Sequence, residues 1–88
     1  EVGELRCEAT GRKVTIFSSQ PAAVLYTGNW LAGGCPITKS DKRYQDYAGV
    51  AIECQGFSDA VNHPEFPSIE LEADELYCQK IVFKLGTF

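Results

Sequence analysis

The chain has 88 residues, of which 44% are hydrophobic and 23% charged, and a formal net charge of −4 at pH 7. This length suits one domain with a small core, and the composition is that of a folded chain. Nucleic acid and membranes are not expected as partners, because the eight lysines and arginines are scattered and no run of about 18 apolar residues or signal-peptide pattern is present.

The first half of the chain shows the alternation of β-strands. The runs Glu4–Ala9 and Lys13–Ser18 are separated by Thr10-Gly11, and this arrangement predicts a hairpin. Ala23–Tyr26 is the next predicted strand. The polar segment Gly33–Asp46 contains two glycines and a proline, which predicts a long surface loop.

The second half predicts three more strands and one ordered turn. Val50–Gln55 is the central strand, and Ile69–Leu71 and Leu76–Leu85 follow as a short and a long one. Ser58–Pro67 contains two prolines and predicts a turn, with one helical turn at Ser58–Val61. Because no long helix or internal repeat is indicated, we expect residues 1–88 to form a single all-β unit, an antiparallel β-sandwich.

The cysteines are spaced too widely for a zinc site. Cys7, Cys35, Cys54 and Cys78 contain no Cys-x-x-Cys pair. Cys54 and Cys78 lie in apolar strand patterns, where free thiols behave as small hydrophobic side chains. We therefore expect reduced structural cysteines and a cytoplasmic protein, because disulfides persist mainly in oxidising compartments.

The central strand carries a single carboxylate among apolar residues. Its side chains alternate between two faces, one with Val50, Ile52 and Cys54 and the other with Ala51, Glu53 and Gln55. This pattern fits a half-buried strand whose polar face meets water. The pattern alone favours this interpretation, but it also allows a polar face that lines a sugar cleft, with Glu53 as a general base.

The residues on and after this strand form a longer motif. Gly49, Glu53 and Gln55 are followed by Asp59–Asn62 and then by Pro64–Pro67. This order resembles the aldose 1-epimerase, or galactose mutarotase, family, whose members carry Gly-x-x-x-Glu-x-Gln, Asp-Ala-Val-Asn and Pro-x-Phe-Pro. The resemblance implies the C-terminal portion of such an enzyme, with part of a mutarotase-like supersandwich fold and Glu53 as the catalytic base.

The implied reaction interconverts the α and β anomers of an aldohexose such as galactose or glucose. A base removes the proton of the anomeric hydroxyl, an acid protonates the ring oxygen, and the ring opens and closes again without a cofactor or metal. The family's acid histidines lie upstream, in segments absent here, and His63 falls in the turn, where we expect a structural role. The missing N-terminal part is thus an expected partner, and the chain alone is expected to be inactive.

A second match concerns the sugar contacts. The run Pro21–Leu31 resembles the family's Pro-x-x-Gln-x-Tyr-Thr-Gly-Asn-Phe-Leu segment, with Trp30 in place of Phe. The resemblance implies that Trp30 stacks on the sugar, although a core position would also suit a tryptophan. Gln55 shares the face of Glu53 and is a further substrate-binding candidate. The family's sugar-contacting Gln falls on Val24, which puts the usual hexose preference in doubt.

Two other functions remain open at this level. The first is a non-catalytic carbohydrate-binding module with a mutarotase-like fold, which the change at Val24 favours. The second is a small β-sandwich interaction domain in which Glu53 is merely solvated.

Tyr47 stands where many family members have His, and no role is assigned to it. If the chain is only the C-terminal portion of a β-sandwich, it would expose sheet edges and an apolar face, through which we expect self-association.

Overall fold

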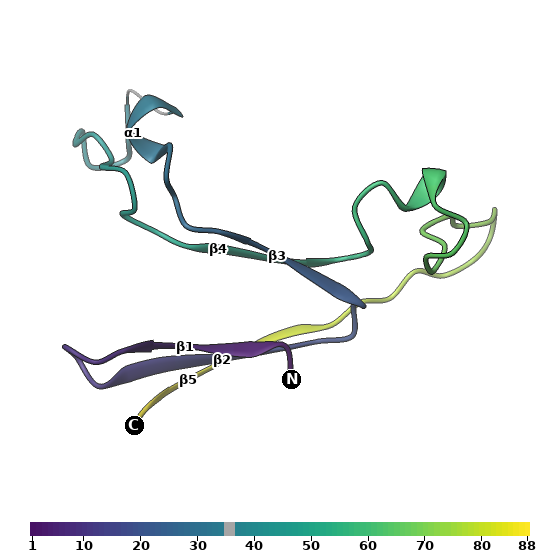
Figure 1. The fold of residues 1–88 in the computed structure, drawn as a ribbon, viewed down its shortest axis with the longest axis horizontal. Coiled ribbons are helices and arrows are strands. Elements are labelled where there is room, and N and C mark those ends of the chain that lie inside the picture. The colour runs from purple at the N-terminus through teal and green to yellow at the C-terminus, as the bar shows by residue number, and fades with distance from the viewer. Residues whose placement is uncertain (35–36) are drawn as a thin grey trace. The chain divides into compact units, whose positions relative to one another are not determined.

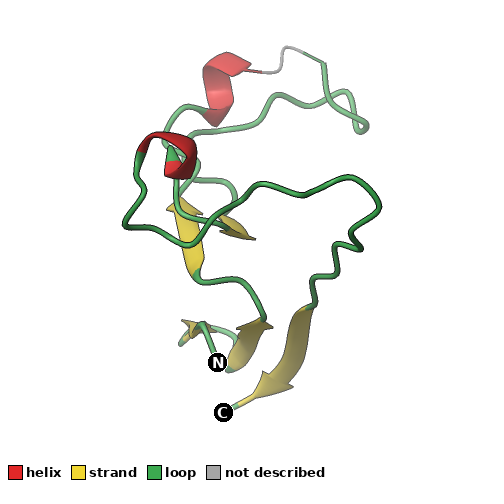
Figure 2. Cartoon of the chain, turned by 90° about the vertical axis from the view of Figure 1, so that its right-hand side faces the viewer, coloured by secondary structure: helices red, strands yellow, loops and turns green. Residues whose placement is uncertain are grey.

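A computed structural model describes residues 1–34 and 37–88 (Figure 1). Among these residues, five strands and two short helical turns follow one another, and most of the remaining chain is loop (Figure 2). The strands form two sheets, with the orders β1-β2-β5 and β3-β4. The expected all-β, sandwich-like class with mostly antiparallel strands is confirmed. The elements are β1 (Gly3–Cys7), β2 (Arg12–Ser18), β3 (Ala22–Tyr26), α1 (Leu31–Gly34), β4 (Ala51–Gln55), η1 (Ala60–Asn62) and β5 (Ile81–Thr87).

The predicted hairpin is present and forms one side of the three-stranded sheet. Strands β1 and β2 are antiparallel, and the turn between them closes with a hydrogen bond from the Thr10 N–H to the Cys7 carbonyl at 3.2 Å. Gly11 has a φ of 62°, a conformation that glycine adopts without strain. Strand β5 pairs with the other edge of β2, which places Phe83 opposite Ile16. Ile16 is 1% exposed and is the most completely buried large side chain described.

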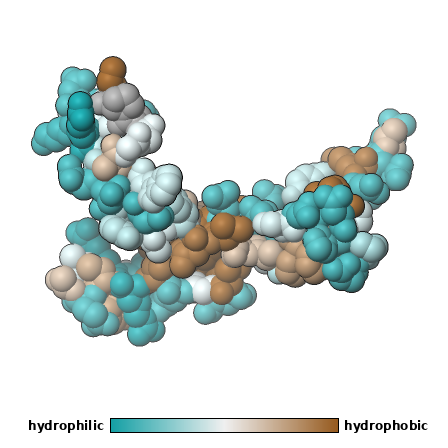
Figure 3. Space-filling view, turned by 45° about the horizontal axis from the view of Figure 1, so that its top comes forward, coloured by the Kyte–Doolittle hydropathy of each residue, from teal (hydrophilic) through white to brown (hydrophobic). Residues whose placement is uncertain are grey.

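Much of the apolar surface is nevertheless open. Besides Ile16, only Cys54 and Ala60 are buried hydrophobic residues in the described chain. Every residue of β5 is exposed, including Phe83 at 55% and Leu85 at 77%. Figure 3 shows such apolar side chains, in brown, at the molecular surface. The sequence supplies more apolar side chains than the described elements cover.

Two predictions for the C-terminal half were wrong. Ile69–Leu71 forms no strand, and the long strand expected at Leu76–Leu85 begins only at Ile81. Cys78, expected inside that strand, is therefore exposed outside it. A strand needs a neighbouring strand for its backbone hydrogen bonds. Within the described residues, no strand pairs with residues 69–79. The pairing of β5 with β2 extends back only to the hydrogen bond from the Ser19 N–H to the Lys80 carbonyl.

The chain groups into two compact units. One consists of Glu1–Ala23 with Cys54–Phe88, and the other of Val24–Glu53. In the second unit, backbone contacts tie the loops that follow β3 and precede β4, because the Tyr47 N–H donates to the Gly28 carbonyl at 2.7 Å. Gly28 has a φ of 73°, and a Cβ there would lie 2.6 Å from the Gly49 carbonyl oxygen, so only glycine fits.

The long loop predicted at Gly33–Asp46 is partly described. Its first two residues belong to α1, and residues 37–46 contain no helix or strand. The Asp46 carboxylate accepts a hydrogen bond from the Ala32 N–H at 2.9 Å, which fixes the far end of the loop beside α1. Cys35 and Pro36 lie outside the described residues, so the expectation of a reduced thiol at Cys35 remains a prediction.

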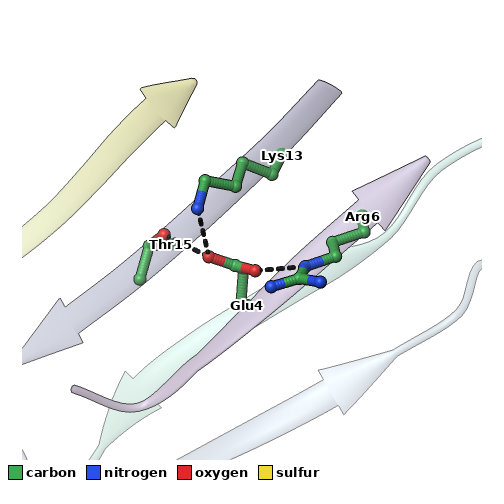
Figure 4. A network of polar contacts seen from close by, with 4 residues as sticks. All are labelled: Glu4, Arg6, Lys13 and Thr15. Atoms are coloured by element: carbon green, nitrogen blue, oxygen red, sulfur yellow. Dashed lines mark hydrogen bonds and ion pairs between the residues drawn. The ribbon is translucent and has the colours of Figure 1, made fainter. Parts of the chain in front are cut away.

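A network of charges stabilises the pairing of β1 with β2 (Figure 4). The Glu4 carboxylate accepts hydrogen bonds from the Arg6 guanidinium and, at 2.8 Å, from the Thr15 hydroxyl, and it forms an ion pair with Lys13 at 3.2 Å. Hydrogen bonds that favour the charged carboxylate lower the pKa of Glu4 to about 2, with the bond from Arg6 contributing most.

This network predicts how the stability that Glu4 contributes to the full-length protein changes at acidic pH. The folded-state pKa of Glu4 lies below the ordinary value of 4.5, so its contribution to stability is complete above that pH and is lost as the pH falls toward 2. Carbon-13 NMR of the side-chain carboxyl should give a Glu4 midpoint near 2. Arg6→Gln should raise that midpoint, whereas Arg12→Gln on the neighbouring strand should not; a wild-type midpoint at the ordinary value would contradict the network.

Candidate active site

Glu53 lies on strand β4 with its side chain open to solvent. The predicted alternation is observed only in part: Cys54 is 6% exposed and Glu53 is exposed, but Ala51, Ile52 and Gln55 are all half-buried and Val50, just before β4, is 53% exposed. Within the described residues, the Glu53 carboxylate has no hydrogen-bond or ion-pair partner. A strand backbone supports this carboxylate while leaving its oxygens accessible. Such a group can accept a proton from a hydroxyl that lies within hydrogen-bond reach.

The Asp-Ala-Val-Asn and Pro-x-Phe-Pro motifs fold into a compact turn directly after β4. Asp59 adopts a φ of 59° before η1, and its carboxylate accepts a hydrogen bond from Asn62 Nδ2 at 2.6 Å. The expected helical turn at Ser58–Val61 is thus present as η1, shifted toward the C-terminus. Gly56 allows the chain to pass Ile69, whose Cγ2 lies 2.5 Å from the position that a Cβ would occupy. The turn therefore fixes the end of the strand that carries Glu53.

His63 is held by its own turn. Its Nδ1 lies 3.0 Å from Glu65 Oε1 and its Nε2 lies 3.4 Å from Asp59 Oδ2. The imidazole also stacks on the Phe66 ring, with 5.0 Å between the ring centroids. Because both ring nitrogens face carboxylates of the same turn, the geometry fits the structural role expected for this histidine.

The candidate sugar-binding residues lie in different surroundings. Gln55 lines a cavity of about 620 Å³, and its Nε2 lies 3.5 Å from Ser58 Oγ. The Trp30 side chain is 79% exposed and lines a cavity of about 450 Å³, and the backbone N–H of Trp30 donates to the Tyr26 hydroxyl at 3.1 Å. Val24 is 39% exposed on β3. Glu53 is absent from both linings, so the described residues do not gather these side chains around one cavity.

Sequence reasoning missed a polar wall in the larger cavity. Gln20, Tyr77 and Gln79 are joined there by hydrogen bonds, although 57 residues separate the first two in the sequence. No local pattern signals such a contact, because it depends on how the loops fold back. Among residues 1–34 and 37–88, no group of three or more His, Cys, Asp or Glu side chains could hold a metal ion. In the same part of the chain, no helix has the length and apolar character to span a membrane.

Two sheets of mainly antiparallel strands, with an exposed carboxylate on β4, define an all-β protein of the sandwich-like class. The sequence profile of the aldose 1-epimerase family matches residues 1–84. The chain belongs to the aldose 1-epimerase family. This result supports the sequence interpretation that began with the motif around Glu53.

Curated relatives agree with this assignment. The galactose mutarotase of Rattus norvegicus is 40% identical over 78 residues, which are 89% of this chain and 22% of the relative. The galactose mutarotase of Homo sapiens is 37% identical over the same shares. The aldose 1-epimerase of Haemophilus influenzae is 45% identical over 51 residues, 58% of this chain and 14% of the relative. The chain thus spans about a fifth of the length of the mutarotases it matches. No solved structure gives a significant match.

Proposed function

We propose that this chain is the C-terminal part of an aldose 1-epimerase that interconverts the anomers of an aldohexose such as galactose or glucose in the cytoplasm. The observation that carries the proposal is Glu53, an exposed carboxylate that has no hydrogen-bond or ion-pair partner among residues 1–34 and 37–88, on the strand that bears the family motif. The exposure of this carboxylate suits a general base, because an accessible oxygen can approach a sugar hydroxyl to within about 3 Å.

In the proposed reaction, Glu53 accepts the proton of the anomeric hydroxyl. The electrons of that O–H bond form the carbonyl, the bond between the anomeric carbon and the ring oxygen breaks, and an acid protonates the ring oxygen. Rotation about the bond next to the carbonyl and closure on the other face give the second anomer, and the two protons return. The described residues supply the base, whereas the acid would come from the remainder of the protein, so the isolated chain should not catalyse the reaction.

Polarimetry of freshly dissolved α-D-galactose tests this function directly. The full-length protein should accelerate the change in optical rotation, and the isolated 88-residue chain should leave the spontaneous rate unchanged. A full-length protein that binds galactose without accelerating anomerisation would instead establish a non-catalytic carbohydrate-binding module. That second candidate is favoured by Val24, an apolar side chain at the position of the family's sugar-contacting amide.

Trp30 should contribute to substrate binding more than to the chemical step. Its exposed indole offers a flat surface for the C–H face of a pyranose. In the full-length protein, Trp30→Ala should raise KM for galactose about five- to tenfold with a smaller change in kcat, because stacking stabilises the bound sugar and the transition state alike. Trp30→Phe should restore most of the affinity, and Tyr44→Ala, an exposed aromatic of the same unit, serves as control. Unchanged KM in Trp30→Ala would remove this residue from the site.

A further inference from the structure

A cavity lies within the unit formed by residues 1–23 and 54–88. Its volume of about 620 Å³ falls in the range of small-molecule sites, about 300–1,000 Å³. Segments distant in the sequence form its walls. Of the candidate site residues Glu53, Gln55, Trp30 and Val24, only Gln55 lines it. The lining consists of Gln20, Pro21, Cys54–Asp59, Pro67–Ile69, Tyr77 and Gln79.

One wall of this cavity is a pre-formed chain of polar groups. Gln20 Nε2 donates to the Tyr77 hydroxyl at 2.8 Å, and that hydroxyl donates to Gln79 Oε1 at 3.0 Å. These bonds orient both amides. Gln20 Oε1 and Gln79 Nε2 have no partner within the described residues. The wall therefore leaves one acceptor and one donor group available to a ligand, on two amides that bond to the same tyrosine hydroxyl.

The charge of the lining narrows the class of ligand. It contains no Lys, Arg or His among the described residues, and its one carboxylate, Asp59, is occupied by Asn62 and His63. An anionic ligand would find no cation there and would meet a negative charge. The lining also carries the hydroxyls of Ser58 and Ser68.

Apolar surface completes the lining. Phe57 belongs to the cavity wall and is fixed by stacking on Phe66, with 4.8 Å between the ring centroids. Pro67 and Ile69 add aliphatic surface nearby. Neutral amides and hydroxyls combined with rigid aromatic and aliphatic groups suit a ligand that presents hydroxyls in some directions and C–H groups in others.

We propose that this cavity is a second carbohydrate site, which binds a neutral polyhydroxylated ligand, a sugar or sugar alcohol, without reacting with it. The amides of Gln20 and Gln79 bond to its hydroxyls, and its C–H groups lie against the aromatic wall. Phosphorylated forms of the same ligand are discriminated against, because nothing in the lining neutralises a phosphate. The proposal does not depend on Glu53 acting as a base.

Galactitol is a suitable probe, because it has the hydroxyls of the sugar but no anomeric centre. Calorimetric titration should show millimolar binding to the full-length protein and to its Glu53→Gln variant. Removing two hydrogen-bonding amides in Gln20→Leu/Gln79→Leu should weaken binding about tenfold or more. Gln45→Leu, the same change at an exposed glutamine outside the lining, should not. Galactitol 1-phosphate should bind at least about tenfold more weakly than galactitol.

Anomerisation of galactose, measured in the same variants, reports whether they fold. The Gln20→Leu/Gln79→Leu and Tyr77→Phe variants should both retain anomerisation. Tyr77→Phe, the milder change, should weaken galactitol binding while keeping the aromatic ring in place. The proposal is overturned if the wild type does not bind galactitol or if the double variant binds it equally well. Parallel loss of galactitol binding and anomerisation in both cavity variants would also overturn it, since the cavity would then belong to the reaction site. If Glu53→Gln anomerises galactose at the wild-type rate while galactitol binding still depends on the cavity residues, Glu53 is not the base. The second carbohydrate site would then still be supported.

Discussion

Replacing Glu53 by Gln in the full-length protein should lower kcat for anomerisation by about 10²–10⁴-fold, the contribution typical of a positioned general base. The amide has nearly the same shape as the carboxylate but cannot take up the proton of the anomeric hydroxyl. Because Glu53 is exposed and forms no hydrogen bond or ion pair with another described side chain, the change should leave folding intact. The expected signature is a loss in kcat with little change in KM.

The control is a second exposed glutamate of the same chain. Glu70 lies beyond the turn that follows β4, and its side chain has no described partner. Glu70→Gln removes the same charge and should leave the rate unchanged, which separates base catalysis from a general effect of net charge. Polarimetry with α-D-galactose measures both variants. A wild-type rate of anomerisation in Glu53→Gln would contradict the proposed mechanism.

The elements that the sequence predicted correctly are those whose partners lie close by or whose turns are strongly encoded. Strands β1 and β2 are joined by a turn with Gly11, and their alternation alone predicts the hairpin. Strand β4 contains the β-branched Ile52 and is followed by a turn whose Asp59, Asn62 and prolines determine its shape. In each case the local physics is sufficient.

The failures share another cause. Residues 69–71 and 76–80 have the apolar alternation of strands, but a ladder requires a neighbouring strand, and the described residues provide none. The same reasoning applies to the site. The exposure of Glu53 follows from alternation along β4, whereas the wall of Gln20, Tyr77 and Gln79 depends on segments 57 or more residues apart. Family resemblance supplied a role for Glu53, and periodicity alone would not have done so.

The isolated chain should self-associate and lack a cooperative thermal transition. Every residue of strand β5 is exposed, including the large apolar side chains of Phe83 and Leu85, so apolar surface along this sheet is open to a second copy. Within residues 1–34 and 37–88, only Ile16, Cys54 and Ala60 are buried hydrophobic residues, and such a core offers little to oppose the loss of chain entropy. Multi-angle light scattering should give masses above 9.7 kDa that rise with concentration.

Strand β5 is the expected route of this association. It is an edge strand with seven exposed residues, and Lys84 is the one charged side chain that protects this sheet edge. Phe83→Lys places a charge at the middle of this edge and should lower the associated mass, whereas Trp30→Ser removes an exposed aromatic in the other unit and should have a smaller effect. In the full-length protein, the remaining polypeptide should cover this surface and restore a cooperative transition. A monodisperse isolated chain of 9.7 kDa that unfolds cooperatively would instead show that these 88 residues stand alone, and would favour a small interaction domain over part of an enzyme.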